Sequence, residues 1–407
     1  MILKKKILFL LTRMPYPAKD GTRAKILYNV LDAVKDRYEC TVVIVSDEKP
    51  DAGSVAYLEE HYGKIRYFYT PQWRRALSGL LHWFCGYPLQ TSYFFSRRVA
   101  RAIASDMASA DVIYAHTIRV GGYFNGASES VRQKTMFDFN DAISYNYATA
   151  KQYASFWWRL IYSLELPRVA RYEMKMLSCF RHCTIVSEAD KDYMVGVAQQ
   201  RGIAMGDGAF RVIRHGVNDK LLNYKNDYRG NRDMVFLGNI FYPPNRDSVV
   251  WFSNFLEEQP SLALGEMSYD VIGRYSQNLK KICPRAIFSG FVEDPYRFIM
   301  EHKIFVSPLR FGSGVPTKIL EAMAIGMPVI TTPEGARSVE GAHNGENIII
   351  CPAIDTKGWA VALELLVNDH DLRKKIGRNA QVLVREKYRS SLSCAAYGKY
   401  FDDIAGG

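Results

Sequence analysis

The stretch from residue 304 to residue 332, IFVSPLRFGSGVPTKILEAMAIGMPVITT, combines a glycine loop with two basic side chains. The order of residues predicts a buried strand, the loop Gly312–Gly314 and then a helix that Pro316 opens. The start of such a helix presents free backbone N–H groups and the positive end of the helix dipole, a combination that binds phosphate groups. Arg310 and Lys318 flank the loop, so both can add charge to a bound diphosphate.

A carboxylate follows on the same predicted helix. Glu321 lies one helical turn beyond Lys318, so the two side chains share a face. A carboxylate there can accept hydrogen bonds from two neighbouring hydroxyls, such as those of a ribose. The alternative is an ordinary strand–helix–strand crossover with a solvated Lys–Glu pair. The agreement of loop, charge and carboxylate favours a nucleotide site.

Further glycine turns follow other predicted strands, at the carboxyl ends where α/β sheets bind ligands. These turns are FLGN at 236–239, VIGR at 271–274 and FSGFV at 288–292, and VIRHGVN at 212–218 precedes them. In order and spacing, these segments and the stretch 304–332 closely resemble the donor-binding signature of retaining nucleotide-sugar glycosyltransferases. The resemblance is to family 4 of the GT-B fold, of the bacterial polysaccharide-assembly type, and it spans essentially the whole chain.

The resemblance implies roles for particular residues. Arg310 and Lys318 would stabilise the leaving diphosphate as catalytic residues. The residues expected to contact the donor are Gly238, Asn239, Asn245, Gly273, Arg274, Phe291, Ser313, Gly314, Val315 and Glu321. Two positions depart from the family pattern. Asn239 and prolines stand where many relatives carry an Arg and a Lys that clamp the diphosphate, and Ser313 replaces the first of two glutamates, which bears on how sugar hydroxyls are recognised.

The loop after the first predicted strand, PYPAKDGTR at 15–23, resembles the glycine loop that faces the acceptor and the donor phosphates. Gly21 would let the backbone approach the reacting sugar, and Arg23 would stand at the start of the next helix. An ordinary surface loop would also use proline and glycine here.

Three polar side chains follow later strands of the first half. His116 comes just past the end of a strand, where it is expected to contact a sugar hydroxyl or orient the acceptor as a third catalytic residue. A lone histidine is otherwise usually structural. Asp138 and Asp141 resemble an Asp-rich motif of acceptor domains in related transferases. Because His or Glu ligands at useful spacing are missing, we predict no metal site there.

The elements that position these residues alternate between strands and helices along both halves of the chain, the pattern of a doubly wound parallel sheet. A chain of 407 residues also exceeds the size at which one core usually splits. We therefore expect an α/β protein with two Rossmann-like domains facing across a cleft. The polar stretch 217–232 looks like the link between the domains. The resemblance implies that residues 1–210 bind the acceptor, that 211–389 bind the nucleotide sugar, and that the helix 390–407 packs back on the first domain.

Composition narrows the class of protein. Hydrophobic residues make up 48% and charged residues 23%, as in soluble globular proteins. The seven cysteines form no CxxC pair and mostly lie in apolar surroundings, which favours buried thiols and a cytoplasmic protein. The apolar run after Lys4–Lys6 is too short for a signal peptide, and we expect no transmembrane helix.

The net charge of +11 lies mostly in the first half. Residues 61–105 hold no acidic residue but many basic and aromatic ones. No nucleic-acid-binding motif accompanies this bias. The segment therefore predicts either peripheral contact with an anionic membrane or a domain surface that is merely basic.

The resemblance therefore implies a retaining glycosyltransferase that moves a sugar from a nucleotide-diphosphate donor to a glycan or lipid-linked acceptor in bacterial surface polysaccharide synthesis. The donor is a co-substrate, and no cofactor or metal is expected. The base, uridine or guanosine, stays open. The alternatives are a sugar-nucleotide 2-epimerase, which needs acids and bases around the sugar ring, and a non-catalytic sugar-nucleotide-binding protein.

Overall fold

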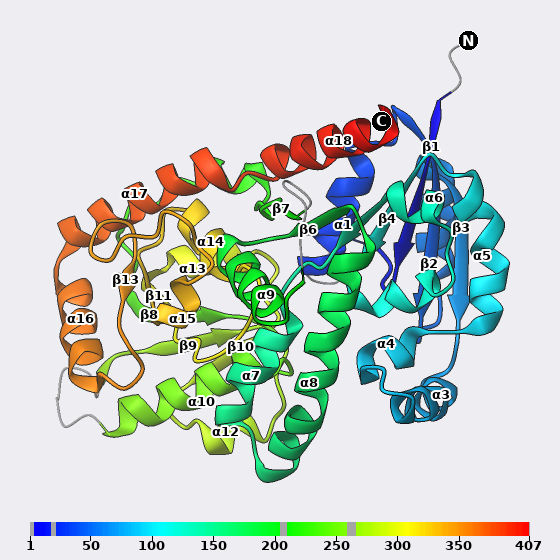
Figure 1. The fold of residues 1–407 in the computed structure, drawn as a ribbon. Coiled ribbons are helices and arrows are strands. Elements are labelled where there is room, and N and C mark those ends of the chain that lie inside the picture. Colours follow the sequence, from blue (N-terminus) through cyan, green and yellow to red (C-terminus); the bar gives the residue numbers. More distant parts are fainter. Residues whose placement is uncertain (1–3, 18–21, 204–209, 259–265, 407) are drawn as a thin grey trace. The chain divides into compact units, whose positions relative to one another are not determined.

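The computed structural model describes residues 4–17, 22–203, 210–258 and 266–406. The chain forms two compact units, each with its own sheet (Figure 1). The first unit consists of Met1–Arg214 together with Ser393–Gly407, and the second of His215–Leu392. The stretch 217–232, which the sequence suggested as an interdomain link, belongs to the second unit.

The first unit is built on a seven-stranded sheet in the order β3-β2-β1-β4-β5-β6-β7, and all neighbouring strands are parallel. Its strands are β1 (Lys5–Leu11), β2 (Tyr38–Ser46), β3 (Gly63–Tyr69), β4 (Val112–His116), β5 (Thr135–Asp138), β6 (His182–Ile185) and β7 (Phe210–Val212). Its helices are α1 (Thr22–Asp32), α2 (Ala52–Tyr62), α3 (Gln72–Phe84), α4 (Leu89–Phe94), α5 (Arg97–Ser109), α6 (Glu129–Gln133), α7 (Ile143–Tyr153), α8 (Phe156–Cys179) and α9 (Glu188–Gln200), with a 3-10 turn η1 (Ile118–Phe124).

Strand β1 is apolar on both faces because helices cover both sides of the sheet. Ile7 and Phe9 belong to one core cluster with residues of α1, whereas Leu8 and Leu10 belong to a second cluster with residues of α5 and α8. Alternating side chains of one strand thus enter two cores, as expected for a doubly wound sheet.

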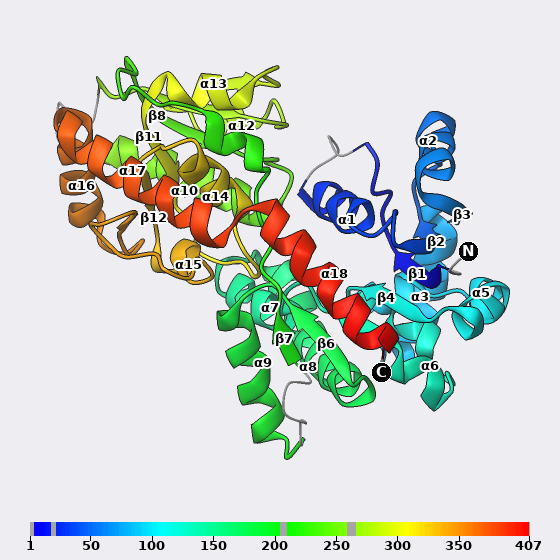
Figure 2. The same cartoon turned by 90° about the horizontal axis from the view of Figure 1, so that it is seen from above.

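The last helix, α18 (Ser390–Gly406), closes one of these cores. Tyr397 and Phe401 are buried in the cluster that contains Phe9. Asp402 accepts hydrogen bonds from Arg37 Nη1 at 2.6 Å and from the Tyr38 hydroxyl at 2.7 Å. Figure 2 shows α18, in red, beside α1 of the same unit. The end of the chain therefore completes the first unit.

The second unit has a six-stranded parallel sheet in the order β10-β9-β8-β11-β12-β13. Its strands are β8 (Arg232–Leu237), β9 (Tyr269–Ile272), β10 (Ile287–Gly290), β11 (His302–Ser307), β12 (Val329–Thr331) and β13 (Ile349–Ile350). Its helices are α10 (Pro243–Glu258), α12 (Leu279–Ile282), α13 (Pro295–Met300), α14 (Thr317–Ala324), α15 (Pro333–Ala336), α16 (Thr356–Asn368) and α17 (His370–Lys387), with a 3-10 turn η2 (Asp219–Asn223). The prediction of two doubly wound parallel sheets is confirmed.

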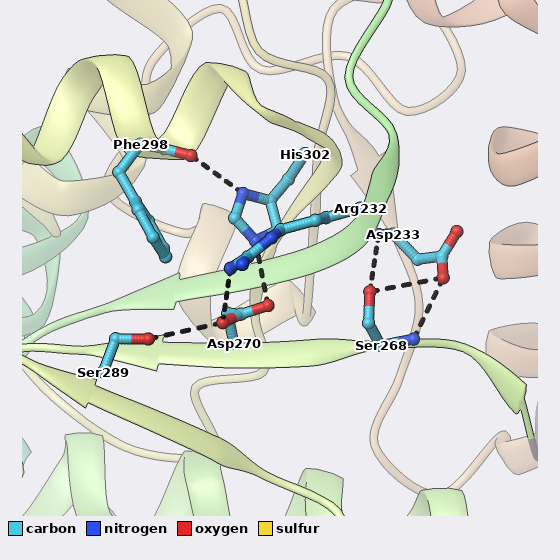
Figure 3. Close-up of polar contacts among 7 residues, drawn as sticks. All are labelled: Arg232, Asp233, Ser268, Asp270, Ser289, Phe298 and His302. Carbon is cyan, nitrogen blue, oxygen red and sulfur yellow. Dashed lines mark hydrogen bonds and ion pairs between the residues drawn. The ribbon is translucent and has the colours of Figure 1, made fainter.

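A buried polar cluster joins the amino ends of three neighbouring strands of this sheet (Figure 3). Asp270 of β9 lies 3.1 Å from His302 Nε2 of β11 and accepts a hydrogen bond from Arg232 Nη1 of β8 at 3.0 Å. His302 Nδ1 lies 2.9 Å from the Phe298 carbonyl oxygen. His302 and Asp270 are almost completely buried. This cluster fixes strand register at the edge opposite the glycine loops, so we assign it a structural role.

All seven cysteines are free thiols; Cys40, Cys183, Cys283 and Cys351 are buried, whereas Cys85 is exposed. Within the described ranges, no helix is both long enough and apolar enough to cross a membrane.

Candidate active site

The candidate site of the second unit lies at the carboxyl ends of β8 and β11. These strands are neighbours, and the order of the sheet reverses between them, the place where open α/β sheets bind ligands. Gly238 directly follows β8, and the loop with Gly312 and Gly314 follows β11. The topology therefore brings the two main glycine turns to one edge.

Glycine is required where two of these turns meet. Gly273 has a φ of +120°, and a Cβ built there would lie 2.1 Å from the Gly238 carbonyl oxygen. A Cβ at Gly238 would lie 2.7 Å from Asn245 Nδ2. A side chain at Gly273 would push the ends of β8 and β9 apart, and one at Gly238 would displace the Asn245 side chain.

Lys318, in the first turn of α14, points at the end of β8. Its Nζ donates to Asn245 Oδ1 at 2.5 Å and lies 4.2 Å from the centre of the Phe236 ring. Asn245 Nδ2 in turn donates to the Asn239 carbonyl oxygen at 2.9 Å. Burial lowers the pKa of Lys318 to about 7, because desolvation penalises the ammonium. Its contacts are an amide and a ring, so a bound anion would stabilise its charge.

Arg310 already has an anionic partner. Its Nε donates to Asp247 Oδ2 at 2.8 Å, and its Nη2 donates to Asp247 Oδ1 at 2.5 Å. This two-point ion pair with α10 holds the guanidinium in one orientation. The sequence reasoning missed Asp247, because a pairing between residues so far apart leaves no local signal. Arg310 thus offers a phosphate a charge that Asp247 partly neutralises.

The loop before α14 supplies backbone donors. Gly314 has a φ of +69°, a conformation that glycine adopts readily. The helix begins at Thr317 with Pro316 as its N-cap, one residue later than the sequence suggested. Ser313, Gly314 and Val315 are half-buried just ahead of it. The start of the helix also carries the positive end of the helix dipole, which favours a bound anion.

Glu321, one turn further along α14, is hydrogen-bonded to Tyr296 of α13. Burial, and then the negative charge and hydrogen bond of Glu321, raise the pKa of the Tyr296 phenol. The sequence reasoning did not identify Tyr296, because no motif marks a tyrosine on a neighbouring helix. Its hydroxyl orients the carboxylate that we assigned to ribose.

The remaining predicted donor contacts are open to solvent. Phe291, just past β10, is 89% exposed, and a ring held in the open at a strand end can stack on a nucleotide base. Asn239 and Arg274 are exposed at the ends of β8 and β9. The structure thus brings Gly238, Asn245 and Lys318 into direct contact and places the other predicted residues along the same edge.

In the first unit, Asp138 is surrounded by the side chains of the protein core. It is fully buried and accepts hydrogen bonds from the hydroxyls of Tyr114, at 2.5 Å, and Tyr397, at 3.0 Å. Burial first, and then the Asp138 charge, raise the pKa of both tyrosines. Asp138 therefore anchors α18 to the sheet, and direct contact with an acceptor is the less favoured role.

His116 stands beside this network at the end of β4. Its Nδ1 lies 3.5 Å from Asp138 Oδ2, and its Nε2 is buried with no hydrogen-bond partner among the described residues. Thr117 and Asn140, which follow β4 and β5, both have positive φ, at 70° and 65°. Strained backbone next to a buried unpartnered nitrogen is typical of a functional edge.

Asp141 accepts a hydrogen bond from Asn140 Nδ2 at 2.8 Å. Near it lies a buried acid that the sequence reasoning missed, Glu173 of α8, which accepts from the Ser144 backbone N–H at 3.2 Å. Burial raises the pKa of Glu173 to about 8, and the Asp141 charge adds to this rise. The signal available in the sequence was an acid on the apolar face of a helix.

The two loop residues of the first unit cannot be placed fully. Gly21 lies outside the described residues. Arg23 belongs to α1, the helix that follows the loop, and its side chain lies outside the described part of the chain.

Comparison with known proteins gives the same picture as the fold. Residues 231–369 match the family described as glycosyl transferases group 1. The chain is 24% identical over 398 residues to an uncharacterized 44.6 kDa protein in the cps region of Klebsiella pneumoniae, covering 95% of this chain and 97% of that protein. It is also 33% identical over 109 residues to the capsular polysaccharide biosynthesis glycosyltransferase CapM of Staphylococcus aureus, or 27% of this chain and 28% of CapM.

Among solved structures, Anabaena HepE in complex with UDP and glucose superimposes with a TM-score of 0.69 at 16% identity, covering 98% of this chain and 100% of HepE. The two parallel-sheet units have the GT-B fold of such structures. Residues 231–369 form a group 1 glycosyl transferase domain, and the protein is a glycosyltransferase.

Proposed function

We propose that the protein is a retaining glycosyltransferase that moves a sugar from a nucleoside diphosphate donor to a glycan or lipid-linked acceptor. We further propose that it acts in the cytoplasm on a precursor of a bacterial surface polysaccharide. The contact between Lys318 and Asn245 at the β8/β11 edge carries the donor proposal. The names of CapM and of the Klebsiella relative support the polysaccharide, and the HepE complex with UDP makes uridine the favoured base.

The chemistry needs positive charge at the leaving group. The bond between the anomeric carbon and a diphosphate oxygen breaks, so negative charge grows on that oxygen while the sugar gains oxocarbenium character. Lys318 and the backbone N–H groups at the start of α14 are preorganised donors for this charge. Losing one such donor typically costs about 3 kcal/mol of barrier stabilisation. Retention of the anomeric configuration is inferred from the family resemblance.

Product analysis tests the proposal. The protein is incubated with UDP-glucose, UDP-galactose or GDP-mannose, each with and without lipid-linked glycan extracted from a deletion strain. Release of nucleoside diphosphate that requires the glycan identifies a transferase. Conversion of the sugar nucleotide without acceptor would identify a 2-epimerase, and binding without turnover would identify a non-catalytic protein. Lys318→Met should abolish release, whereas Lys375→Met, which removes an exposed lysine of α17, should not.

We also propose that transfer requires no divalent metal, because Lys318 and the start of α14 can supply the positive charge. Among the described residues, no group of three His, Cys, Asp or Glu side chains is placed to hold a metal ion. An activity assay with a chelator tests the metal requirement directly. EDTA should leave the initial rate nearly unchanged. Strong inhibition that added Mg²⁺ or Mn²⁺ reverses would contradict this proposal.

A further inference from the structure

Helix α3 turns its apolar face to solvent. Amphipathic helices of globular proteins normally turn that face to the core. In α3 the buried residues are Arg75 and Gly79, whereas Trp73 is 65% and Phe84 is 74% exposed. The exposed face, at helical spacing, consists of Trp73, Leu77, Leu80, Leu81 and Phe84.

The beginning of α8 has the same character. Its first three residues, Phe156, Trp157 and Trp158, are all exposed, and Trp157 is 71% exposed. The exposed apolar residues continue along the helix with Leu160, Ile161 and Leu164. We call these residues and the exposed face of α3 the aromatic surface.

Direct contacts join the two helices. Trp83 Nε1 of α3 donates to Glu165 Oε1 of α8 at 2.5 Å, and the Leu89 backbone N–H donates to Glu165 Oε2 at 2.8 Å. The Arg168 guanidinium lies 4.3 Å from the Trp83 ring. Figure 1 shows α3 and the start of α8 at the same end of the first unit. The aromatic surface is therefore held together by its own polar contacts.

The charge of this region has one sign. Residues 61–105 and 142–164 contain no Asp or Glu, and Glu165, the first acid after residue 164, is buried against Trp83. Arg74 and Arg159 are exposed beside the rings. Exposed tryptophan, phenylalanine and leucine with adjacent arginine is the composition of surfaces that enter the headgroup region of an anionic bilayer.

We propose that the aromatic surface docks the first unit on an anionic lipid bilayer. A second copy of the chain is the weaker candidate, because an isologous contact would bring the same arginines together with no acid to pair them. The structure also revises the segment that the sequence suggested. Arg75 is buried and cannot contact lipid, whereas residues 156–164 belong to the surface although they lie outside 61–105.

The aromatic surface lies on helices that follow the carboxyl ends of strands in the first sheet. Helix α3 follows the carboxyl end of β3, and α8 follows α7 beyond the carboxyl end of β5. His116 stands at the carboxyl end of β4 in the same sheet. If the acceptor is lipid-linked, as in the proposed function, docking there brings the bilayer to the carboxyl edge of this sheet, where the acceptor would bind.

Vesicle binding of the full chain tests the proposal. Wild-type protein should sediment with vesicles of phosphatidylcholine and phosphatidylglycerol, and only partly dissociate in high salt, because insertion of rings survives screening. The double variant Phe156→Ser/Trp157→Ser should lower the partition coefficient by about tenfold or more, since it removes two inserted rings. Brominated lipids should quench tryptophan fluorescence, and Trp157→Phe should reduce quenching while binding persists.

Two matched controls keep the result interpretable. Ile354→Ser/Val361→Ser removes two exposed apolar side chains of the second unit and should bind vesicles like wild type. Lys318→Met should also bind normally, so failure of the donor chemistry and failure of docking are separable. Wild type that ignores anionic vesicles at low salt overturns the proposal. A dimer in light scattering that Phe156→Ser/Trp157→Ser dissociates, without vesicle binding, would assign the surface to a second copy.

Discussion

Lys318 is a basic residue whose nearest described partners are an amide oxygen and an aromatic ring. Its pKa is lowered from 10.5 to about 7 by burial, so near pH 8 much of it is neutral in the free protein. A diphosphate beside it would favour the ammonium and raise that pKa. Donor binding should then take up a proton above pH 7, and affinity should fall as pH rises through the window between the two pKa values.

Calorimetry at pH 8 in buffers of different ionisation enthalpy measures this uptake. Lys318→Arg keeps a charge that does not titrate in this range, so it should remove the uptake. Equal proton uptake by wild type and Lys318→Arg would show that another group is responsible, and no uptake in wild type would contradict the assigned contact.

Glu321 and Tyr296 give a second prediction. If the carboxylate holds ribose, Glu321→Ala should cost about 2 kcal/mol of UDP affinity, the usual contribution of hydrogen bonds to a charged group. Tyr296→Phe should lower UDP affinity by less, because it removes only the hydroxyl that orients the Glu321 carboxylate. Inorganic pyrophosphate, which has no ribose, is the control ligand. A matching loss of pyrophosphate affinity in Glu321→Ala would mean that the substitution damaged the phosphate site instead.

At the scale of single residues, the sequence predicted the site residues that belong to motifs, but it did not predict the distant side chains that hold Arg310 and Glu321 in place. The glycines, Asn245 and Lys318 could be selected because each belongs to a loop or helix start that follows a predicted strand. Asp247 and Tyr296 could not, because they meet Arg310 and Glu321 only after distant helices pack together. Asp138 was selected for its motif, yet its contacts with Tyr114 and Tyr397 are those of a buried anchor.

At the scale of elements, the sequence predicted the central strands of both sheets and also β10, an edge strand of the second sheet. β1, β2, β8 and β11 are buried on both faces and read as apolar runs. The sequence analysis did not identify the edge strands β3, β7 and β13, because a half-exposed or very short strand has no such run. These three strands are thus set by tertiary pairing more than by local composition.

The Asp270 cluster leads to a prediction about the opposite edge of the second sheet. Asp270→Asn leaves His302 and Arg232 without the carboxylate that joins their strands, so it should lower the free energy of unfolding by about 3 kcal/mol. Ser289→Ala, which removes only the 3.4 Å contact of its hydroxyl with Asp270, is the mild control. Urea denaturation measures both changes. UDP affinity of folded Asp270→Asn should match wild type, and a large loss of affinity would contradict a purely structural role.

At the scale of the whole molecule, each unit has its own sheet and its own pair of cores. The sequence predicted two domains from length and from the repeated strand–helix pattern. It could not predict how α18 is anchored, because the Tyr397–Asp138 contact joins residues 259 positions apart in the sequence.

Units with separate cores should unfold as separate cooperative transitions. In differential scanning calorimetry, Asp270→Asn should lower the Tm of one transition, and UDP should raise the Tm of that same transition, because ligands stabilise only the unit that binds them. Tyr397→Phe removes the hydroxyl that donates a hydrogen bond to the buried Asp138, so it should lower the Tm of the other transition. If both substitutions and UDP all shifted one common transition, the two units would form a single folding unit, and the assignment of nucleotide binding to the second unit alone would lose this support.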